Sequence, residues 1–236
     1  MNDIKVIRRL EFMFQSFFFL PIKYNLGTNE QAKMNFNPFK ILEYFTFGKN
    51  RLEQEKEELN KEVAALSSNL IPYTKADSDL LSFACVDKSH RGDTLKGIFV
   101  SIYDEPMVAF VVKDYKSSKL NRLIAVNTAN HKLVYIKTPK SVQVFFNDQQ
   151  IGFMTEDYKF YGMKKRLVGR VNSGGKGSYS SVVYKDKELG IINDLAFDSP
   201  FPKRVFDIIN DKLTAEGEII LISMSFYFLV DKFSKS

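Results

Sequence analysis

The chain has very little of the chemistry that disulfide-bonded or thiol-dependent proteins use. Only one of its 236 residues is a cysteine, Cys85, so no internal disulfide can form and a reducing, cytoplasmic compartment is expected. Cys85 lies in the apolar segment 82–86 with no basic residue beside it. We therefore expect a small buried hydrophobe there, with a reactive thiol as the alternative interpretation.

Apolar runs long enough to cross a bilayer are also absent from the sequence. The two apolar runs, residues 10–22 and 219–230, are both shorter than the roughly 20 residues that a membrane-spanning helix needs. The first run contains Glu11, ends at Pro21 and is followed by no small-residue cleavage site, so it is not typical of a signal peptide. We expect both runs to be buried and predict no transmembrane span.

Catalytic, metal and nucleotide motifs are missing as well. His90 and His131 lie in predicted turns without Cys, Asp or Glu at metal-ligand spacing, which argues against a zinc site. The glycine-rich segment 169–178 differs from a phosphate-binding loop, because Arg170 and Gly177 stand where Gly and Ser or Thr are needed. No Gly-x-Ser-x-Gly elbow is present. The sequence therefore predicts no catalytic residue, no metal and no cofactor, and favours a non-enzymatic binding protein.

Helical patterns dominate the first third of the chain. Residues 1–76 are expected to form a helical extension and linker, and residues 77–236 a separate β domain. The clearest helix covers residues 39–70, with Glu and Lys on one face. Its apolar stripe consists of Leu52, Leu59, Val63, Leu66 and Leu70. Two interpretations stay open: the helix packs on its own β domain, or it docks a protein partner or a second copy as a short coiled coil.

From about residue 81 the hydrophobic period changes to two, which is typical of strands. The 22 Phe and 11 Tyr residues suit half-buried pleated surfaces. Many short strands with tight polar turns predict a mainly β fold, an antiparallel β-barrel of about 11–12 strands. The expected strands are residues 82–87, 97–103, 107–113, 121–127, 132–137, 142–147, 150–155, 158–162, 166–172, 179–185 and 188–193.

A hairpin repeat supports this architecture. Residues 144–152 align without gaps on residues 182–190, and each copy reads as strand, polar turn and return strand. Residues 159–169 form a looser third copy. The glycines that end the copies, Gly152 and Gly190, are expected to mark a β-bulge or a close backbone approach.

The C-terminal region has a different pattern. Residues 202–213 place their apolar side chains on one helical face, so a helix is expected there. Residues 218–231 are too long an apolar stretch for one strand, and Thr214 is a suitable N-cap. A helix that is apolar on every face must be buried on every face. We therefore expect the sheet to enclose this helix.

A many-stranded barrel around a C-terminal hydrophobic helix resembles the tubby-like superfamily, which includes the tubby C-terminal domain, phospholipid scramblases and LURP-one-related proteins. The hairpins 144–152 and 182–190 and the helix 218–231 carry the resemblance, which covers residues 80–233. It implies association with phospholipid or phosphoinositide through basic side chains on the barrel surface.

The sequence departs from the scramblases within that group. A cysteine cluster for acylation is absent, because Cys85 is the only cysteine. The acidic residues near the last helix lack the compact spacing of a calcium loop. These residues are Asp194, Asp198, Asp207 and Asp211. Calcium-driven lipid scrambling is therefore not expected.

The positive charge is concentrated in the middle of the chain. The net charge is +6, but residues 113–187 contain fifteen Lys or Arg against five Asp or Glu. The densest part, and the candidate site for an anionic head group, consists of Lys164, Lys165, Arg166, Arg170 and Lys176. Such a zone attracts an anionic membrane surface, while lysine-solvated strand faces are the simpler interpretation. Nucleic acid is less favoured, because no RNA-binding aromatic signature is present.

Overall fold

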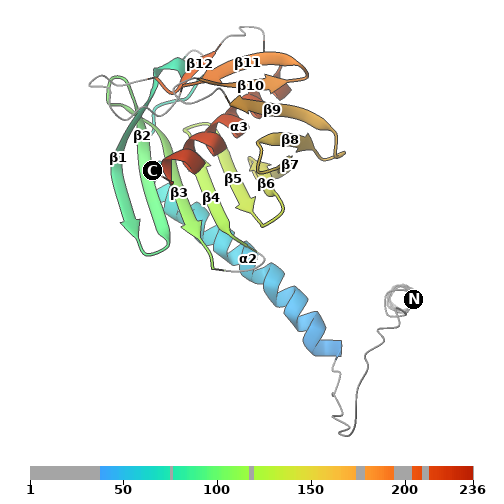
Figure 1. Ribbon diagram of the computed structural model, residues 1–236. Coiled ribbons are helices and arrows are strands. Elements are labelled where there is room, and N and C mark those ends of the chain that lie inside the picture. Colours follow the sequence, from blue (N-terminus) through green and yellow to red (C-terminus); the bar gives the residue numbers. More distant parts are fainter. Residues whose placement is uncertain are drawn as a thin grey trace, which may run out of the picture. The chain divides into compact units, whose positions relative to one another are not determined.

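The computed structural model describes residues 38–74, 77–116, 120–173, 179–193, 204–208 and 213–235. The contacts divide the chain into two compact units, Met1–Tyr44 and Phe45–Ser236. The described elements are shown in Figure 1. They are helix α2 (Pro38–Leu66), a short 3-10 helix η1 (Ser78–Leu80), strands β1 (Leu81–Arg91), β2 (Thr94–Ser101), β3 (Pro106–Asp114), β4 (Arg122–Asn127), β5 (Lys132–Lys137), β6 (Val142–Phe146), β7 (Gln149–Met154), β8 (Lys159–Gly162), β9 (Leu167–Ser173), β10 (Ser180–Tyr184), β11 (Lys187–Ile192) and β12 (Phe206–Ile208), and helix α3 (Ala215–Phe233).

The strands form one antiparallel sheet in which each strand pairs with the next along the chain. The sheet nearly closes on itself, because Ser82 forms a β-bridge with Arg204 and the Val205 N–H donates to the Leu81 carbonyl at 2.7 Å. The predicted mainly β barrel with its helical additions is confirmed. Every expected strand is present, with ends that differ by a few residues.

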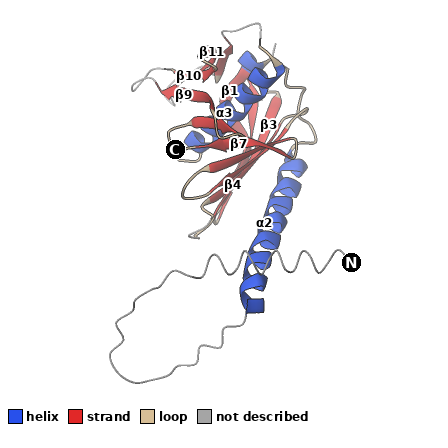
Figure 2. Cartoon of the chain, turned by 90° about the vertical axis from the view of Figure 1, so that its right-hand side faces the viewer, coloured by secondary structure: helices blue, strands red, loops and turns tan. Residues whose placement is uncertain are grey.

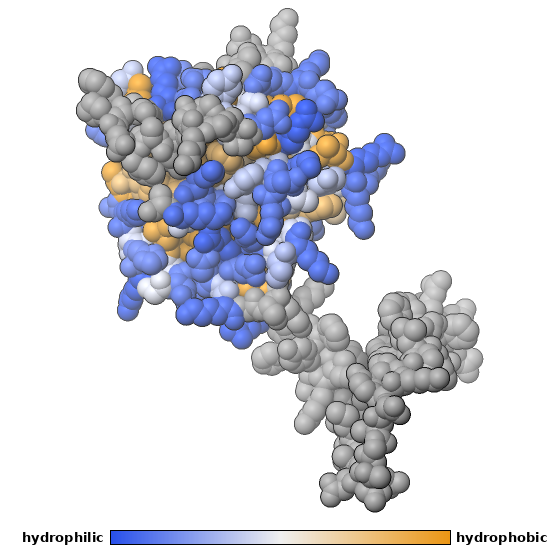
Figure 3. All heavy atoms as spheres, in the orientation of Figure 1, coloured by the Kyte–Doolittle hydropathy of each residue, from blue (hydrophilic) through white to orange (hydrophobic). Residues whose placement is uncertain are grey.

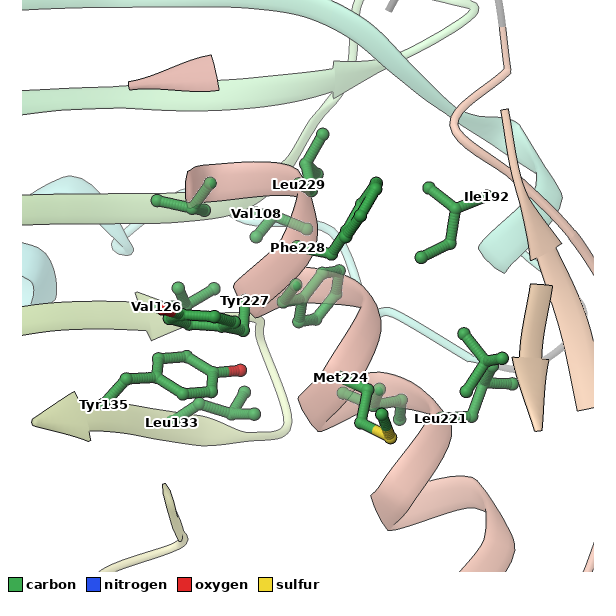
Figure 4. Close-up of a cluster of buried hydrophobic side chains, with 14 of the residues drawn as sticks. Val108, Val126, Leu133, Tyr135, Ile192, Leu221, Met224, Tyr227, Phe228 and Leu229 are labelled. Carbon is green, nitrogen blue, oxygen red and sulfur yellow. The ribbon is translucent and has the colours of Figure 1, made fainter. Parts of the chain in front are cut away.

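Helix α3 lies inside the curve of the sheet. Figures 1 and 2 show β9, β10 and β11 on one side of it and β1 and β3 on the other. All residues from Ile220 to Asp231 are buried. Figure 4 shows Tyr227 directed toward Tyr135 and Phe228 toward Ile192, and the two tyrosine ring centroids are 5.3 Å apart. The enclosed helix is therefore confirmed.

The start of α3 follows the capping rule that the sequence suggested. The Thr214 hydroxyl accepts a hydrogen bond from the Gly217 N–H at 3.1 Å. This bond satisfies one of the backbone donors that a helix N-terminus leaves without an intrahelical partner. The helix is thus fixed at its first turn as well as by its apolar surface.

Three successive hairpins share one geometry. Val144 pairs with Gly152, Phe160 with Gly169 and Val182 with Gly190, and a register shift lies next to each pair. A Cβ atom on Gly152 would lie 2.2 Å from the Tyr161 carbonyl oxygen, so only glycine fits. The expected bulges are confirmed, including the one in the looser copy 159–169.

The tips of the two closely matching hairpins also agree. Asn147 and Asp148 have φ values of 46° and 66°, and Lys185 and Asp186 have 46° and 62°. Two consecutive positive φ angles are the mark of the type I′ turn, whose twist matches that of the flanking strands. The sequence repeat is therefore a repeat of turn type as well as of strand length.

The predicted helix over residues 202–213 is wrong for the part that is described. Phe206–Ile208 form strand β12, which pairs with β11, and residues 202–203 and 209–212 lie outside the described residues. Val205 and Phe206 are buried, and backbone pairing with β11 and β1 outweighs the helical spacing of the apolar side chains. His90, expected in a turn, lies in β1.

Helix α2 packs on the outer face of the barrel. Leu59 and Val63 are 1% and 0% exposed and join a second hydrophobic cluster with residues of β2 to β5. The cluster members from the sheet are Ile98, Ala109, Val111, Leu123, Ala125, Val134 and Ile136. Because α3 covers the inner face and α2 the outer one, β3 and β4 are apolar along almost their whole length.

The polar edge of α2 is also tied to the sheet. The Glu55 carboxylate accepts hydrogen bonds from Lys113 at 2.5 Å and from Tyr115 at 2.7 Å. Lys56 lies over the Phe145 ring at 4.6 Å. The contacts therefore place residues from Phe45 onward in the unit of the barrel, whereas the expected boundary lay at residues 76–77. Of the two interpretations of the helix, packing on its own β domain is the one observed for residues 52–66.

Candidate functional site

The densest group of cations lies in one short turn. Lys164, Lys165 and Arg166 are exposed and connect β8 to β9. Residues 163–166 are called the β8–β9 turn below. Arg170 lies further along β9 and is half-buried. Three of the five basic residues that the sequence predicted as a ligand site therefore lie in one turn, and Arg170 lies four residues further along the chain.

Two backbone hydrogen bonds fix the β8–β9 turn. The Lys165 N–H donates to the Gly162 carbonyl at 2.8 Å, and the Gly162 N–H donates to the Arg166 carbonyl at 3.1 Å. Lys165 has a φ of 56°, so a type I turn is followed by a residue in the left-handed region, a common three-residue hairpin connection. The cations are thus presented by a defined backbone conformation.

The charges of the turn are not neutralised by any carboxylate in the part of the chain that the structure describes. Among the described residues, no Asp or Glu oxygen lies within 4.0 Å of the charged groups of Lys164, Lys165 or Arg166. The cations nearby do have partners: Lys159 pairs with Asp157 at 2.6 Å, and Arg170 lies 3.8 Å from Asp186. The turn therefore carries three adjacent cations whose charge no described carboxylate neutralises.

Apolar side chains flank these cations. Met163 is 62% exposed and Leu167 is 47% exposed. Leu167 pairs with Tyr161 across the hairpin, and the Tyr161 ring stacks on the Phe153 ring of β7 at a centroid distance of 5.2 Å. These residues occupy the outer face, because their neighbours in the chain, such as Phe160, belong to the inner core. Figure 3 shows hydrophilic side chains protruding over the tip of the β8–β9 hairpin, with an apolar area beside them.

Sequence reasoning missed the apolar members of this surface. Tyr161 could have been found, because it alternates with the inward Phe160 within β8. Met163 lies in the turn and Leu167 follows it next to a register shift, so alternation along one strand does not decide their exposure. The expected fifth cation, Lys176, lies outside the described residues, and β9 ends at Ser173, the opposite end of the strand from Arg166.

A second charged cluster lies at the C-terminal end of α3. The Asp231 side chain is 2% exposed and lies 3.3 Å from Arg122, 3.6 Å from Lys137 and 2.5 Å from Lys235. Its Oδ2, the oxygen that Lys235 contacts, also accepts a hydrogen bond from the Tyr158 hydroxyl at 3.1 Å. Every side of this carboxylate has a partner, so the cluster fixes the end of the helix and offers no vacant ligand position.

The electrostatics of Asp231 agree with that role. Burial raises the pKa of its carboxyl, but the hydrogen bond from Lys235 and the positive charge of Lys137 outweigh burial, so the pKa lies below its ordinary value. A carboxylate held in its charged form is a poor proton donor near neutral pH. The cluster therefore has the properties of a structural ion-pair network.

A metal centre is absent from the described ranges, because no group of three or more His, Cys, Asp and Glu residues there has the arrangement of a metal site. The cavity beside α3, lined by residues that include Tyr73, Leu221 and Ser225, has a volume of about 20 Å³, which is close to that of a single water molecule. Neither described helix combines the length and the apolar content that a bilayer-spanning segment requires.

Comparisons with protein-family models, with curated proteins and with solved structures give no match.

Proposed function

We propose that this protein is a non-enzymatic binding module that associates with anionic phospholipid head groups through the β8–β9 turn. The observation that carries the proposal is the group of three adjacent exposed cations, Lys164, Lys165 and Arg166, that have no carboxylate partner among the described residues. Arg170 adds a fourth positive charge, reduced by Asp186. The proposal includes a cytoplasmic location at the membrane surface, which the single cysteine favours.

The expected strength follows from simple electrostatics. Each Lys or Arg near an anionic bilayer contributes about 1 kcal/mol, so the three turn cations contribute about 3 kcal/mol, or roughly a hundredfold in affinity. That attraction weakens as salt shortens the screening length below about 8 Å. Binding is therefore expected to be weak, reversible and dependent on salt. The layout of a barrel around a hydrophobic helix, which resembles tubby-like proteins, supports the same ligand class.

Nucleic acid fits this surface less well. RNA-binding sheets present aromatic rings on which unpaired bases stack. Here the outer-face rings of Phe153 and Tyr161 are half-buried and stack on each other with an interplanar angle of 8°. One face of each ring is therefore covered by the other ring. A nucleic-acid base could stack on that face only by separating the two rings.

Co-sedimentation with liposomes tests the proposal. The protein is mixed with phosphatidylcholine vesicles that contain or lack phosphatidylserine, over a series of salt concentrations. The test variant is Lys164→Glu/Lys165→Glu/Arg166→Glu. The matched control, Lys132→Glu/Lys140→Glu/Lys187→Glu, makes the same change in net charge at exposed lysines elsewhere on the barrel.

Binding of the natural sequence should rise with phosphatidylserine and fall with salt. The turn variant should lose at least about a hundredfold in affinity, since it removes three attractive charges and adds three repelled ones, and the control should keep most of it. Equal losses in both variants would show that only net charge matters, and binding that ignores lipid charge would contradict the proposal.

Docking of a protein partner through helix 39–70 stays a prediction. The apolar stripe at Leu59 and Val63 is covered by the barrel of the same chain, so a partner on that face would first have to displace the helix. The side chains of residues 38–49 lie outside the described residues. Light scattering of the full chain over a concentration series measures whether copies associate.

A further inference from the structure

The geometry points to a second element of membrane binding at the same site: we infer that the β8–β9 turn inserts Met163 and Leu167 below the phosphates of an anionic bilayer. This inference rests on the proposed function and adds to it. The cations would hold the turn at the surface, and the two apolar side chains would enter the interfacial layer. Part of the free energy of membrane binding would then be independent of the salt concentration.

Exposed apolar side chains are few on the described surface, which makes this pair informative. The exposed large hydrophobic side chains are Val86, Tyr103, Met163, Leu167 and Tyr179. Met163 and Leu167 alone among them lie close together in the chain, on either side of the three turn cations. Single exposed hydrophobic residues are common on protein surfaces. An apolar pair surrounded by charged residues is instead typical of an interaction site. Because the residues between this pair are cations, an anionic partner is complementary to it in charge.

The reach of the side chains suits a shallow insertion. Lys and Arg have long apolar stems, so their charged ends can stay with the phosphates while the backbone of the turn lies deeper. The backbone hydrogen bonds of Gly162 keep the turn folded during such contact, because both are made within the hairpin. Tyr161, beside Leu167, has the amphipathic ring that is enriched at membrane interfaces.

The size of the apolar area distinguishes a membrane from a protein partner. A stable protein interface buries about 800 Å² on each side around an apolar centre, which two side chains and three uncompensated cations do not provide. A bilayer requires no matching surface, since each inserted side chain contributes through its own burial. The surface therefore fits lipid better than it fits a folded protein.

The absence of tryptophan allows a direct test. The chain contains no Trp, so Met163→Trp introduces a single tryptophan, at the turn, whose emission can be excited apart from that of the tyrosines. Tyr179→Trp is the matched control, because Tyr179 is 57% exposed and precedes β10 at Ser180, which pairs with Ser173 at the far end of β9. Each variant is titrated with phosphatidylcholine–phosphatidylserine vesicles, with and without lipids brominated near the head group.

The expected result is a blue shift and bromine quenching of Met163→Trp, with neither change in Tyr179→Trp. In a separate measurement at high salt, Met163→Ser/Leu167→Ser should bind the same vesicles about tenfold more weakly than the natural sequence. The exposed control Tyr103→Ser should leave affinity unchanged. Both substitutions in the double variant lie at exposed positions, so circular dichroism should show a normally folded protein.

The outcomes separate the two proposals. If no variant binds anionic vesicles, the proposed function fails and this inference fails with it. If the vesicles bind but Met163→Trp is neither shifted nor quenched, head-group contact stands and insertion is refuted. Quenching of Tyr179→Trp alone would show that the opposite end of the strands meets the bilayer, which also refutes the inference.

Discussion

Replacing Leu59 by Ala tests whether α2 is an integral part of the barrel unit. The Leu59 side chain is 1% exposed and lies in the cluster that covers the outer face of the sheet. Leu→Ala removes about three carbon atoms, worth about 2 to 2.5 kcal/mol of transfer free energy at 0.8 kcal/mol each. The cavity left behind adds to this loss, so the free energy of unfolding should fall by about 3 kcal/mol.

Urea unfolding followed by far-ultraviolet circular dichroism measures the change. The matched control is Glu62→Ala, at an exposed position of the same helix, which should change stability by less than about 0.5 kcal/mol. For a unit of this size the Leu59→Ala loss corresponds to a melting temperature lower by about 6 to 12 °C. Both variants should show a single transition if α2 and the barrel unfold together.

A Leu59→Ala variant as stable as Glu62→Ala would refute this reasoning. The helix would then contribute nothing to the barrel, and its apolar stripe would be available to a partner. A separate early transition, with the barrel melting unchanged, would show that the helix detaches by itself. Either result would strengthen the docking prediction for helix 39–70 at the expense of the packing seen here.

Three further predictions concern pH, capping and thiol reactivity. The hydrogen bond from Lys113 lowers the pKa of Glu55, so the stabilisation by this carboxylate is complete above its unfolded pKa of about 4.3 and is lost as the pH falls through the lower folded value. Glu55→Gln should therefore be less stable than the natural sequence at neutral pH yet lose less stability on acidification to about pH 3, and an equal or steeper loss in urea unfolding would contradict this. Thr214→Ala should lower the free energy of unfolding by about 1 kcal/mol, whereas Thr214→Ser, which keeps the hydroxyl, should be close to neutral in the same measurement. Burial raises the pKa of the Cys85 thiol to about 11, so about one thiol in a thousand is ionised at about pH 8; iodoacetamide should label it slowly in the folded protein and rapidly in urea, and equal rates would refute its burial.

The strands could be located from the sequence because turn chemistry marks their ends. Residues such as Asn147 and Asp148 tolerate positive φ, and the alternation on either side of them is local information. Strand β12 could not be found in this way. Its apolar residues, including Phe206, also fit a helical face, and only the edges of β11 and β1, distant in the sequence, decide in favour of pairing.

The candidate site was only half visible in the sequence for a similar reason. A run of cations such as Lys164–Arg166 can be read directly, but whether each has a carboxylate partner depends on the fold. The exposure of Met163 and Leu167 depends on which side of the hairpin faces α3. Whether Lys176 belongs with the turn stays a prediction, because Lys176 lies outside the described residues.

The packing of α3 explains why a ligand site is sought on the outside of this barrel. Side chains of the size of Tyr227 and Phe228 fill the interior, and the cavity beside the helix, about 20 Å³ among the described residues, is too small for a lipid head group. We therefore expect residues of the core to set stability and residues of the β8–β9 turn to set the proposed affinity for anionic vesicles. Since neither hydrophobic cluster includes residues 163–166, the effects of the two groups should be additive: Leu59→Ala should lower the melting temperature without changing vesicle binding below that temperature. The charge reversal at Lys164 should do the opposite, and a core variant that abolished binding while still folded would disprove this separation.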